Sequence, residues 1–141
     1  MPPFLRVNYR TLWREAMRGK SIGRILTNEA LKQWREEVRG IVLDCACGKS
    51  PSYWRILSLK DNGKVRLVSI DYNPAFRPTV VANLIHLLPF KDAIADVVII
   101  SSFLHIVPDP QEFLKEVWRI MNSGGRLLLT APLVFPYTPE P

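Results

Sequence analysis

The sequence has 141 residues, of which 48% are hydrophobic and 23% are charged, and its formal net charge is +6. These proportions are typical of a globular protein and exclude a disordered chain, and the length is sufficient for one domain with a sizeable core. No apolar run approaches the ~20 residues of a membrane span, and the first residues lack the apolar core of a signal peptide, so we expect a cytoplasmic protein.

Much of the positive charge lies near the N-terminus. Arg10, Arg14 and Arg18 are spaced four residues apart and would share one face of a helix. Such a face is compatible with an anionic partner, including a nucleic acid, but it does not require one. A solvated helix face is the simpler interpretation.

Residues 9–39 have a helical pattern of apolar residues, and Gly19 and Gly23 are expected to divide it into two helices. From Ile41 onward, short apolar strands alternate with helical stretches. Ser50 is expected to cap a helix whose first turn contains Pro51, and Pro110 opens the last helix. The expected strands are residues 41–45, 65–71, 79–83, 95–101 and 126–132.

This alternation predicts an α/β fold with a parallel sheet of about five strands and helices on both faces. We expect a single domain over residues 1–141. Within it, residues 1–39 form an N-terminal helical extension, residues 40–132 form the core, and residues 133–141 form an irregular tail.

Two cysteines lie directly after the first expected strand. Cys45 and Cys47 are one residue apart, a spacing that suits neither a redox pair nor the usual zinc site. We therefore expect both to pack as small apolar residues, and we expect no metal site.

Polar residues recur where the expected strands end, and ligands of open parallel sheets bind beyond those ends. They are Asp44 and Gly48 at the first strand, Asp71 at the second, Asn83 at the third, and Ser101 and Ser102 at the fourth. The alternative for Asp44, Asp71 and Asn83 is that each only caps a helix or a turn.

These positions suit a ligand with a ribose and an amino-acid tail. Gly48 allows the backbone to approach the ligand, and the helix that begins near Ser50 would direct N–H groups toward a carboxylate. Asp71 follows the glycine at about the distance expected for an acid that binds ribose hydroxyls.

The chain resembles the class I S-adenosylmethionine-dependent methyltransferases, particularly the subgroup of the ubiquinone and menaquinone C-methyltransferases. The segment VLDCACGKS takes the place of that family's Val-Leu-Asp-x-Gly-x-Gly-x-Gly loop, and SIDYNP matches its acidic second motif. The segments LLPF, DVVI, LHIVPDP, EVWR and GGR follow in the family's order. The resemblance covers residues 41–137 and implies a Rossmann-like fold with S-adenosyl-L-methionine as cofactor.

The resemblance also implies roles for individual residues. Asp44, Cys45, Ala46 and Gly48 would surround the methionine moiety, and Asp71 would bind the ribose hydroxyls. The remaining cofactor-binding positions would be Tyr72, Asn83 and Leu84 around the adenine, and Ser101 and Ser102 beside the sulfonium. His105 is the candidate for a general base, and the alternative is a histidine packed in a turn. Phe135 and Tyr137 are candidates for an acceptor pocket.

The sequence departs from the family pattern in two ways. Ala46 and Ser50 replace the first and third loop glycines. We expect Ala46 to cost little if its φ stays negative. Ser50 places a side chain where the family usually leaves space, unless it caps the helix instead. We also expect the usual strands six and seven to be missing, so that the fifth strand is an exposed edge that pairs with a second copy or a partner subunit. The alternatives are that the N-terminal helices and the tail cover this edge, or that the sequence is a remnant.

We expect an S-adenosylmethionine-dependent methyltransferase that acts on a small-molecule acceptor. The alternative is a methyltransferase-like binding or partner subunit without catalysis.

Overall fold

The structure is a computed structural model, and it describes residues 8–60, 63–85 and 87–132. Its helices are α1 (Tyr9–Met17), α2 (Ile22–Lys32), α3 (Tyr53–Ile56) and α4 (Pro110–Ile120), with short 3-10 turns η1 (Pro74–Phe76) and η2 (Leu104–Ile106). Its strands are β1 (Gly40–Cys45), β2 (Val65–Asp71), β3 (Val80–Val81), β4 (Ala95–Ser101) and β5 (Met121–Thr130). Phe135 and Tyr137 lie outside the described residues.

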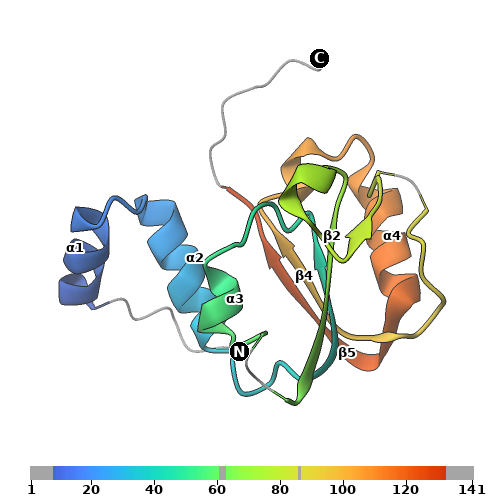
Figure 1. The fold of residues 1–141 in the computed structure, drawn as a ribbon, viewed down its shortest axis with the longest axis horizontal. Coiled ribbons are helices and arrows are strands. Elements are labelled where there is room, and N and C mark those ends of the chain that lie inside the picture. The colour runs from blue at the N-terminus through green and yellow to red at the C-terminus, as the bar shows by residue number, and fades with distance from the viewer. Residues whose placement is uncertain (1–7, 61–62, 86, 133–141) are drawn as a thin grey trace.

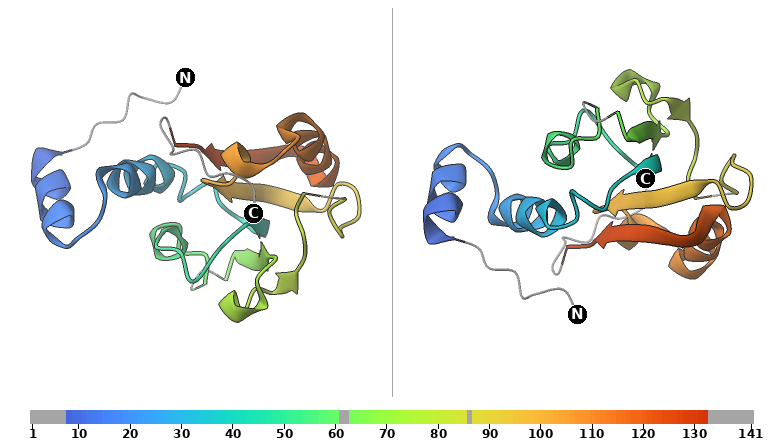
Figure 2. Two further views of the ribbon diagram at one scale, coloured as in Figure 1. Left: turned by 90° about the horizontal axis from the view of Figure 1, so that it is seen from above. Right: turned by 90° about the horizontal axis from the view of Figure 1, so that it is seen from below.

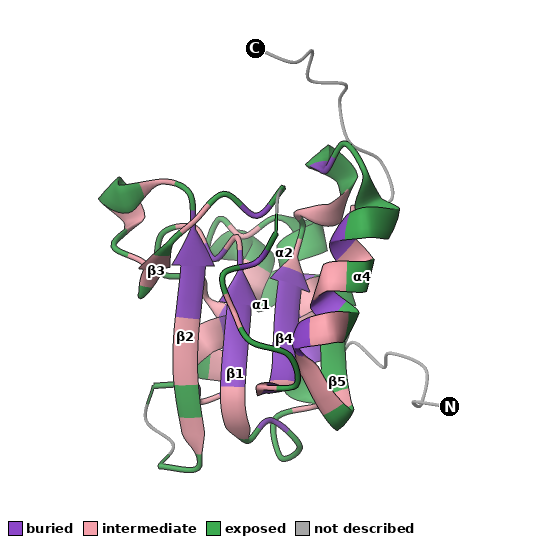
Figure 3. Cartoon of the chain, turned by 90° about the vertical axis from the view of Figure 1, so that its right-hand side faces the viewer, coloured by how far each residue is buried: buried purple, intermediate pink, exposed green. Residues whose placement is uncertain are grey.

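The strands form one parallel sheet in the order β3-β2-β1-β4-β5 (Figure 1). The chain builds outward from β1 to β3 on one side and from β4 to β5 on the other. The strand order therefore reverses between β1 and β4, where open sheets of this kind bind their ligands. The central strands are buried toward their carboxyl ends (Figure 3). The predicted Rossmann-like α/β fold is confirmed.

Apolar side chains cover both faces of the sheet. On one face, Leu43 of β1 and Val98 of β4 pack in a cluster with Val117 of α4. On the opposite face, Val42 and Ile99 belong to a second cluster that includes Leu31 of α2 together with Tyr53 and Leu57. Successive strand residues thus enter different layers, as the period of a strand requires.

The N-terminal helix is peripheral. Figure 2 shows α1 standing off from the sheet and joined to it through α2. None of the residues of α1 is buried. Among the described residues, no helix is both long and apolar enough to cross a membrane.

Several predicted boundaries were wrong. The second helix ends at Lys32, and residues 33–37 form turns. The third strand has only two residues. β5 begins at Met121, five residues before the start that we expected at residue 126. Its pairing with β4 shifts register between Ala95 and Val97, because a bulge accommodates the extra residues.

A carboxylate on β4 fixes the start of β1. Asp96 accepts hydrogen bonds from the Ile41 N–H at 2.8 Å and from the Asn122 side-chain amide at 2.9 Å. Gly40 has a φ of +75°, and a Cβ added there would lie 2.0 Å from Asp96 Oδ2. Only glycine therefore satisfies both the backbone conformation and the close approach.

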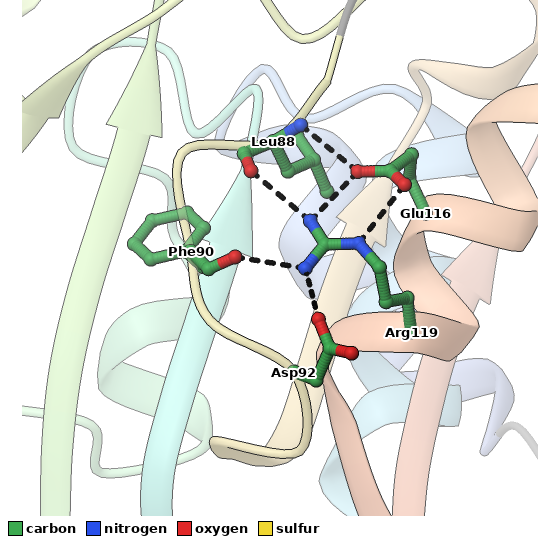
Figure 4. A network of polar contacts seen from close by, with 5 residues as sticks. All are labelled: Leu88, Phe90, Asp92, Glu116 and Arg119. Carbon is green, nitrogen blue, oxygen red and sulfur yellow. Dashed lines mark hydrogen bonds and ion pairs between the residues drawn. The ribbon is translucent and has the colours of Figure 1, made fainter.

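A salt-bridge network joins α4 to the segment that leads into β4 (Figure 4). Arg119 donates to both carboxylate oxygens of Glu116, to Asp92, and to the backbone carbonyls of Leu88 and Phe90, at 2.6–3.1 Å. Glu116 in turn accepts the Leu88 N–H, and its hydrogen bond from Arg119 lowers its pKa. The network gives a physical reason for the LPF and EVWR segments to occur together in the sequence.

We predict that Arg119→Ala lowers the urea concentration at the midpoint of unfolding, because it leaves a half-buried carboxylate and two carbonyls without their donor. Lys115→Ala is the matched control, since Lys115 forms an exposed i,i+3 pair with Glu112 on the same helix and should lower the midpoint much less. Urea denaturation measures both. Equal losses for the two variants would contradict a structural role for the network.

Candidate functional site

A hollow of about 370 Å³ lies at the carboxyl edge of the sheet. This volume is within the range of small-molecule sites. The hollow is lined by residues that follow β1, β2, β3 and β4, so segments far apart in the sequence meet there. The lining residues are Ala46, Asp71, Tyr72, Phe76, Asn83, Leu84, Ile85, Ser102, Phe103 and Ile106.

Asp71 is the carboxylate of this hollow, and it is buried with 4% of its surface exposed. Its Oδ2 accepts the Gly48 N–H at 2.8 Å, and its Oδ1 accepts the Asn73 N–H at 3.0 Å. A carboxylate oxygen has two lone pairs. Each oxygen of Asp71 therefore keeps an acceptor site for a ligand hydroxyl.

Six of the ten predicted cofactor-binding residues line the hollow: Ala46, Asp71, Tyr72, Asn83, Leu84 and Ser102. Tyr72 is 73% exposed, so its ring is free to cover a ligand. Asn83 accepts the Ile85 N–H in a local turn, which is the capping role that we had kept as an alternative. Its lining position is compatible with both roles.

Ser101 and Ser102 differ in position although they are adjacent. Ser101 accepts a hydrogen bond from the Thr130 hydroxyl at 3.3 Å and does not line the hollow. Ser102 has a φ of +56° and lines the hollow, and its N–H donates to the Thr130 carbonyl at 2.8 Å. β5 thus fixes the turn that follows β4.

Asp44 does not line the hollow. It is fully buried on the face of the sheet that α3 covers, where the Tyr53 hydroxyl donates to it at 2.9 Å and the Trp54 indole N–H donates to Oδ2. Burial raises the pKa of Asp44 to about 7. The Asp71 charge also contributes to the raised pKa of Asp44, so the two carboxylates interact although only Asp71 lines the hollow.

The loop after β1 has an unusual backbone. Ala46, Gly48 and Ser50 have φ values of +57°, +62° and +48°, so all three adopt the left-handed conformation that favours glycine. These are the three glycine positions of the family pattern. The condition under which Ala46 would cost little, a negative φ, is therefore not met. The two non-glycine residues each store roughly 1–3 kcal/mol of strain.

The expected helix start at Ser50 is also wrong. α3 begins at Tyr53, its N-cap is Ser52, and no side chain caps it. Because Ser50 has a positive φ, its backbone cannot enter a helix. With only four residues, α3 does not supply the N-terminal anion site that we had predicted at this position.

Two further predicted residues, Cys45 and His105, do not line the hollow. Cys45 packs in the apolar core next to β4, as expected, and burial raises the pKa of the Cys47 thiol to about 11. Across the described ranges, no group of three or more His, Cys, Asp or Glu side chains could hold a metal ion. His105 is exposed and does not line the hollow, although its neighbours Phe103 and Ile106 are close enough to do so. Its role as a general base stays a prediction.

Sequence reasoning missed the apolar wall of the hollow and the partners of Asp44. Phe76, Ile85, Phe103 and Ile106 carry no polar signal and were indistinguishable from core residues. Tyr53 and Trp54 were not predicted as partners of Asp44. The signal that was available is that buried Tyr and Trp usually find a hydrogen-bond acceptor, and Asp44 is the nearest acidic residue before them in the sequence.

The sequence model of the methyltransferase domain family matches residues 43–129. This match covers more than half of the chain, from β1 to β5, and the chain belongs to this family. The resemblance to methyltransferases that use S-adenosylmethionine is thereby confirmed. A curated relative, the ubiquinone/menaquinone biosynthesis C-methyltransferase UbiE of a Ruegeria species, is 48% identical over 42 residues, which make up 30% of this chain and 17% of the relative.

Solved structures share the fold at low sequence identity. The trans-methyltransferase CalH, solved in complex with S-adenosylhomocysteine, has a TM-score of 0.56 and 19% identity, with 81% of this chain and 40% of CalH covered. A protein of Methanococcus maripaludis assigned to the S-adenosylmethionine-dependent methyltransferases has a TM-score of 0.56 and 15% identity, with 74% and 52% covered. The chain thus spans about half the length of these structures.

We predict that the stability of the protein falls between about pH 4 and pH 7 because of Asp44. Its pKa in the folded protein is about 7, whereas an unfolded aspartate has a pKa of about 3.9. Between these values only the folded state holds the proton, so a rising pH favours unfolding, by at most ~4 kcal/mol over the whole interval. Asp44→Asn removes this decline, which urea titrations at several pH values measure.

Asp109→Asn is the matched control, because Asp109 is an exposed helix cap and asparagine caps equally well. It should keep the decline of the parent protein. An Asp44→Asn variant that loses stability over the same pH range as the parent would show that Asp44 is ionised throughout.

Proposed function

We propose that this chain binds S-adenosyl-L-methionine in the hollow at the carboxyl edge and transfers its methyl group to a small-molecule acceptor. The observation that supports this most directly is the position of Asp71. Its carboxylate lies in the hollow at the end of β2, with an acceptor site left on each oxygen. In sites that bind dinucleotides or nucleosides, an acidic residue at the end of the second strand accepts hydrogen bonds from the ribose hydroxyls.

The lining residues suit an adenosine. Tyr72 offers an exposed aromatic face, and Leu84 and Phe103 offer an apolar wall for a flat base. Asn83 has an amide group at the same rim. The match is better for the nucleoside than for the methionine tail, because Asp44 is engaged by Tyr53 and Trp54.

The loop after β1 is the proposed contact for the methionine tail. Gly48 has no atom within 4 Å of the position where a Cβ would lie, so the backbone there is open to a ligand. Its own N–H is held by Asp71. One carboxylate would therefore orient both the loop and the ribose.

When bound, S-adenosyl-L-methionine would supply an electrophilic methyl group to the acceptor, and its sulfur would keep the electron pair of the broken bond. The protein contributes mainly by aligning the two reactants. A base is needed only if the acceptor must lose a proton, and we propose His105, next to the lining residue Ile106, for that role.

The proposal also includes self-association at the edge of the sheet. Leu127 and Leu129 of β5 are 36% and 39% exposed, and a groove of about 410 Å³ runs between β5 and Trp34. A second copy would cover an edge that otherwise offers unpaired backbone groups. Sedimentation equilibrium should show a dimer that Leu127→Lys weakens, and a monomer at tens of micromolar would contradict it.

The cytoplasmic location of the protein likewise stays a prediction.

Isothermal calorimetry with S-adenosylhomocysteine tests the binding part of the proposal. The parent protein should bind it, and Asp71→Asn should weaken binding about 10- to 100-fold, because a charge-assisted hydrogen bond is worth ~1.5–3 kcal/mol. Tyr72→Ala should weaken binding by less, about 2- to 10-fold. Its side chain is exposed, so this loss is separable from misfolding.

Tyr9→Ala is the matched control, since Tyr9 is an aromatic residue of similar exposure, 86%, on α1. It should bind as the parent does. The absence of heat with the parent protein, or equal affinity in Tyr72→Ala, would overturn the proposed site. Binding without methyl transfer to any acceptor in a screen with labelled cofactor would instead favour a binding subunit.

A further inference from the structure

A second hollow, of about 260 Å³, lies between α1, α2 and α3. It shares no lining residue with the hollow at the carboxyl edge of the sheet. Its apolar part is formed by Ile25, which is 2% exposed, and Ile56. The proposed methyl transfer does not require this hollow.

The charge around this second hollow is strongly positive. Five cationic side chains line it, against the two carboxylates of Glu15 and Glu29. Glu15 already pairs with Arg14 and Lys20 of this group, and with Arg18 outside it. The other three cations, Lys32, Arg35 and Arg55, form no ion pair with any residue in the described part of the chain.

A buried amide also lines the second hollow. Asn28 is 94% buried, and its Oδ1 accepts a hydrogen bond from the Ser52 hydroxyl at 3.3 Å. Within the residues that the structure describes, its Nδ2 donates no hydrogen bond to the protein, and no side-chain nitrogen that is itself buried lacks a partner there, so Nδ2 keeps some exposed surface. The hollow therefore combines an accessible amide donor, carried by a largely buried side chain, with unpaired cations from two helices and from the turn that follows α2.

We propose that this hollow binds a small phosphorylated molecule. The three unpaired cations are exposed and line one hollow, so an anion bound there would be attracted by all of them. A tetrahedral phosphate accepts from several donors at once. The guanidinium groups of Arg35 and Arg55 suit phosphate because each can donate two parallel hydrogen bonds. The small volume of the hollow and the largely buried Asn28 side chain favour a small ligand over the extended backbone of a nucleic acid.

Calorimetry with inorganic pyrophosphate as the probe tests this site. The parent protein should bind pyrophosphate, and Arg55→Gln should weaken the binding at least about tenfold. Asn28→Asp should weaken it by a similar factor, because it places a negative charge in the hollow. This variant keeps the oxygen that accepts from Ser52 and nearly the same shape, so it should fold, which thermal unfolding checks.

Arg66→Gln is the matched control, since Arg66 is an exposed cation on β2 outside both hollows. It should change the affinity less than twofold. The proposal would be overturned if the parent did not bind pyrophosphate, if Asn28→Asp bound it unchanged, or if Arg66→Gln lost as much as Arg55→Gln. Tighter binding of citrate than of pyrophosphate would overturn the choice of phosphate. An RNA oligomer that pyrophosphate cannot displace would overturn the choice of a small ligand.

Discussion

The arrangement of the site depends on one buried carboxylate. Asp71 accepts backbone N–H groups from both sides, from Gly48 in the loop after β1 and from Asn73 in the turn after β2. A buried carboxylate must be hydrogen-bonded, so these two segments are held at one place on the sheet edge. The same place adjoins the reversal of strand order between β1 and β4. The hollow exists because parallel strands end together there and because Asp71 holds the loops after β1 and β2 in place.

The segments around this carboxylate are held by different means. Arg119 anchors the residues before β4 by hydrogen bonds to two carbonyls, and the Thr130 carbonyl holds the turn after β4. The loop after β1 instead carries strain, because Ala46 and Ser50 adopt the conformation of glycine. The three glycine positions of the family pattern thus all keep a left-handed backbone, although two of them are Ala46 and Ser50 in this sequence. The substitutions alter the energy of the loop more than its path.

Much of the fold could be predicted from the sequence, because apolar strands alternate with helical patterns and the polar strand ends fall at one edge. The parallel sheet and its cover of helices on both faces followed from those rules. The position of Asp44 could not be predicted, since its burial depends on Tyr53 and Trp54 of a helix that starts later than its sequence signals indicate. The start of β5 was missed because the bulge opposite Ala95 and Val97 depends on pairing with β4. The boundary between the N-terminal helical extension, residues 1–39, and the core, residues 40–132, stays a prediction.

Two groups of charges thus have separate proposed roles. The Asp71 carboxylate of β2 binds the ribose of a nucleoside, and the cations around the second hollow bind a phosphate. The first role is central, and a crystal structure of the protein with S-adenosylhomocysteine is its decisive test. We expect both ribose hydroxyls within hydrogen-bonding distance of the Asp71 carboxylate and the adenine beside Tyr72. A ligand bound elsewhere, or a ribose that makes no contact with Asp71, would contradict it.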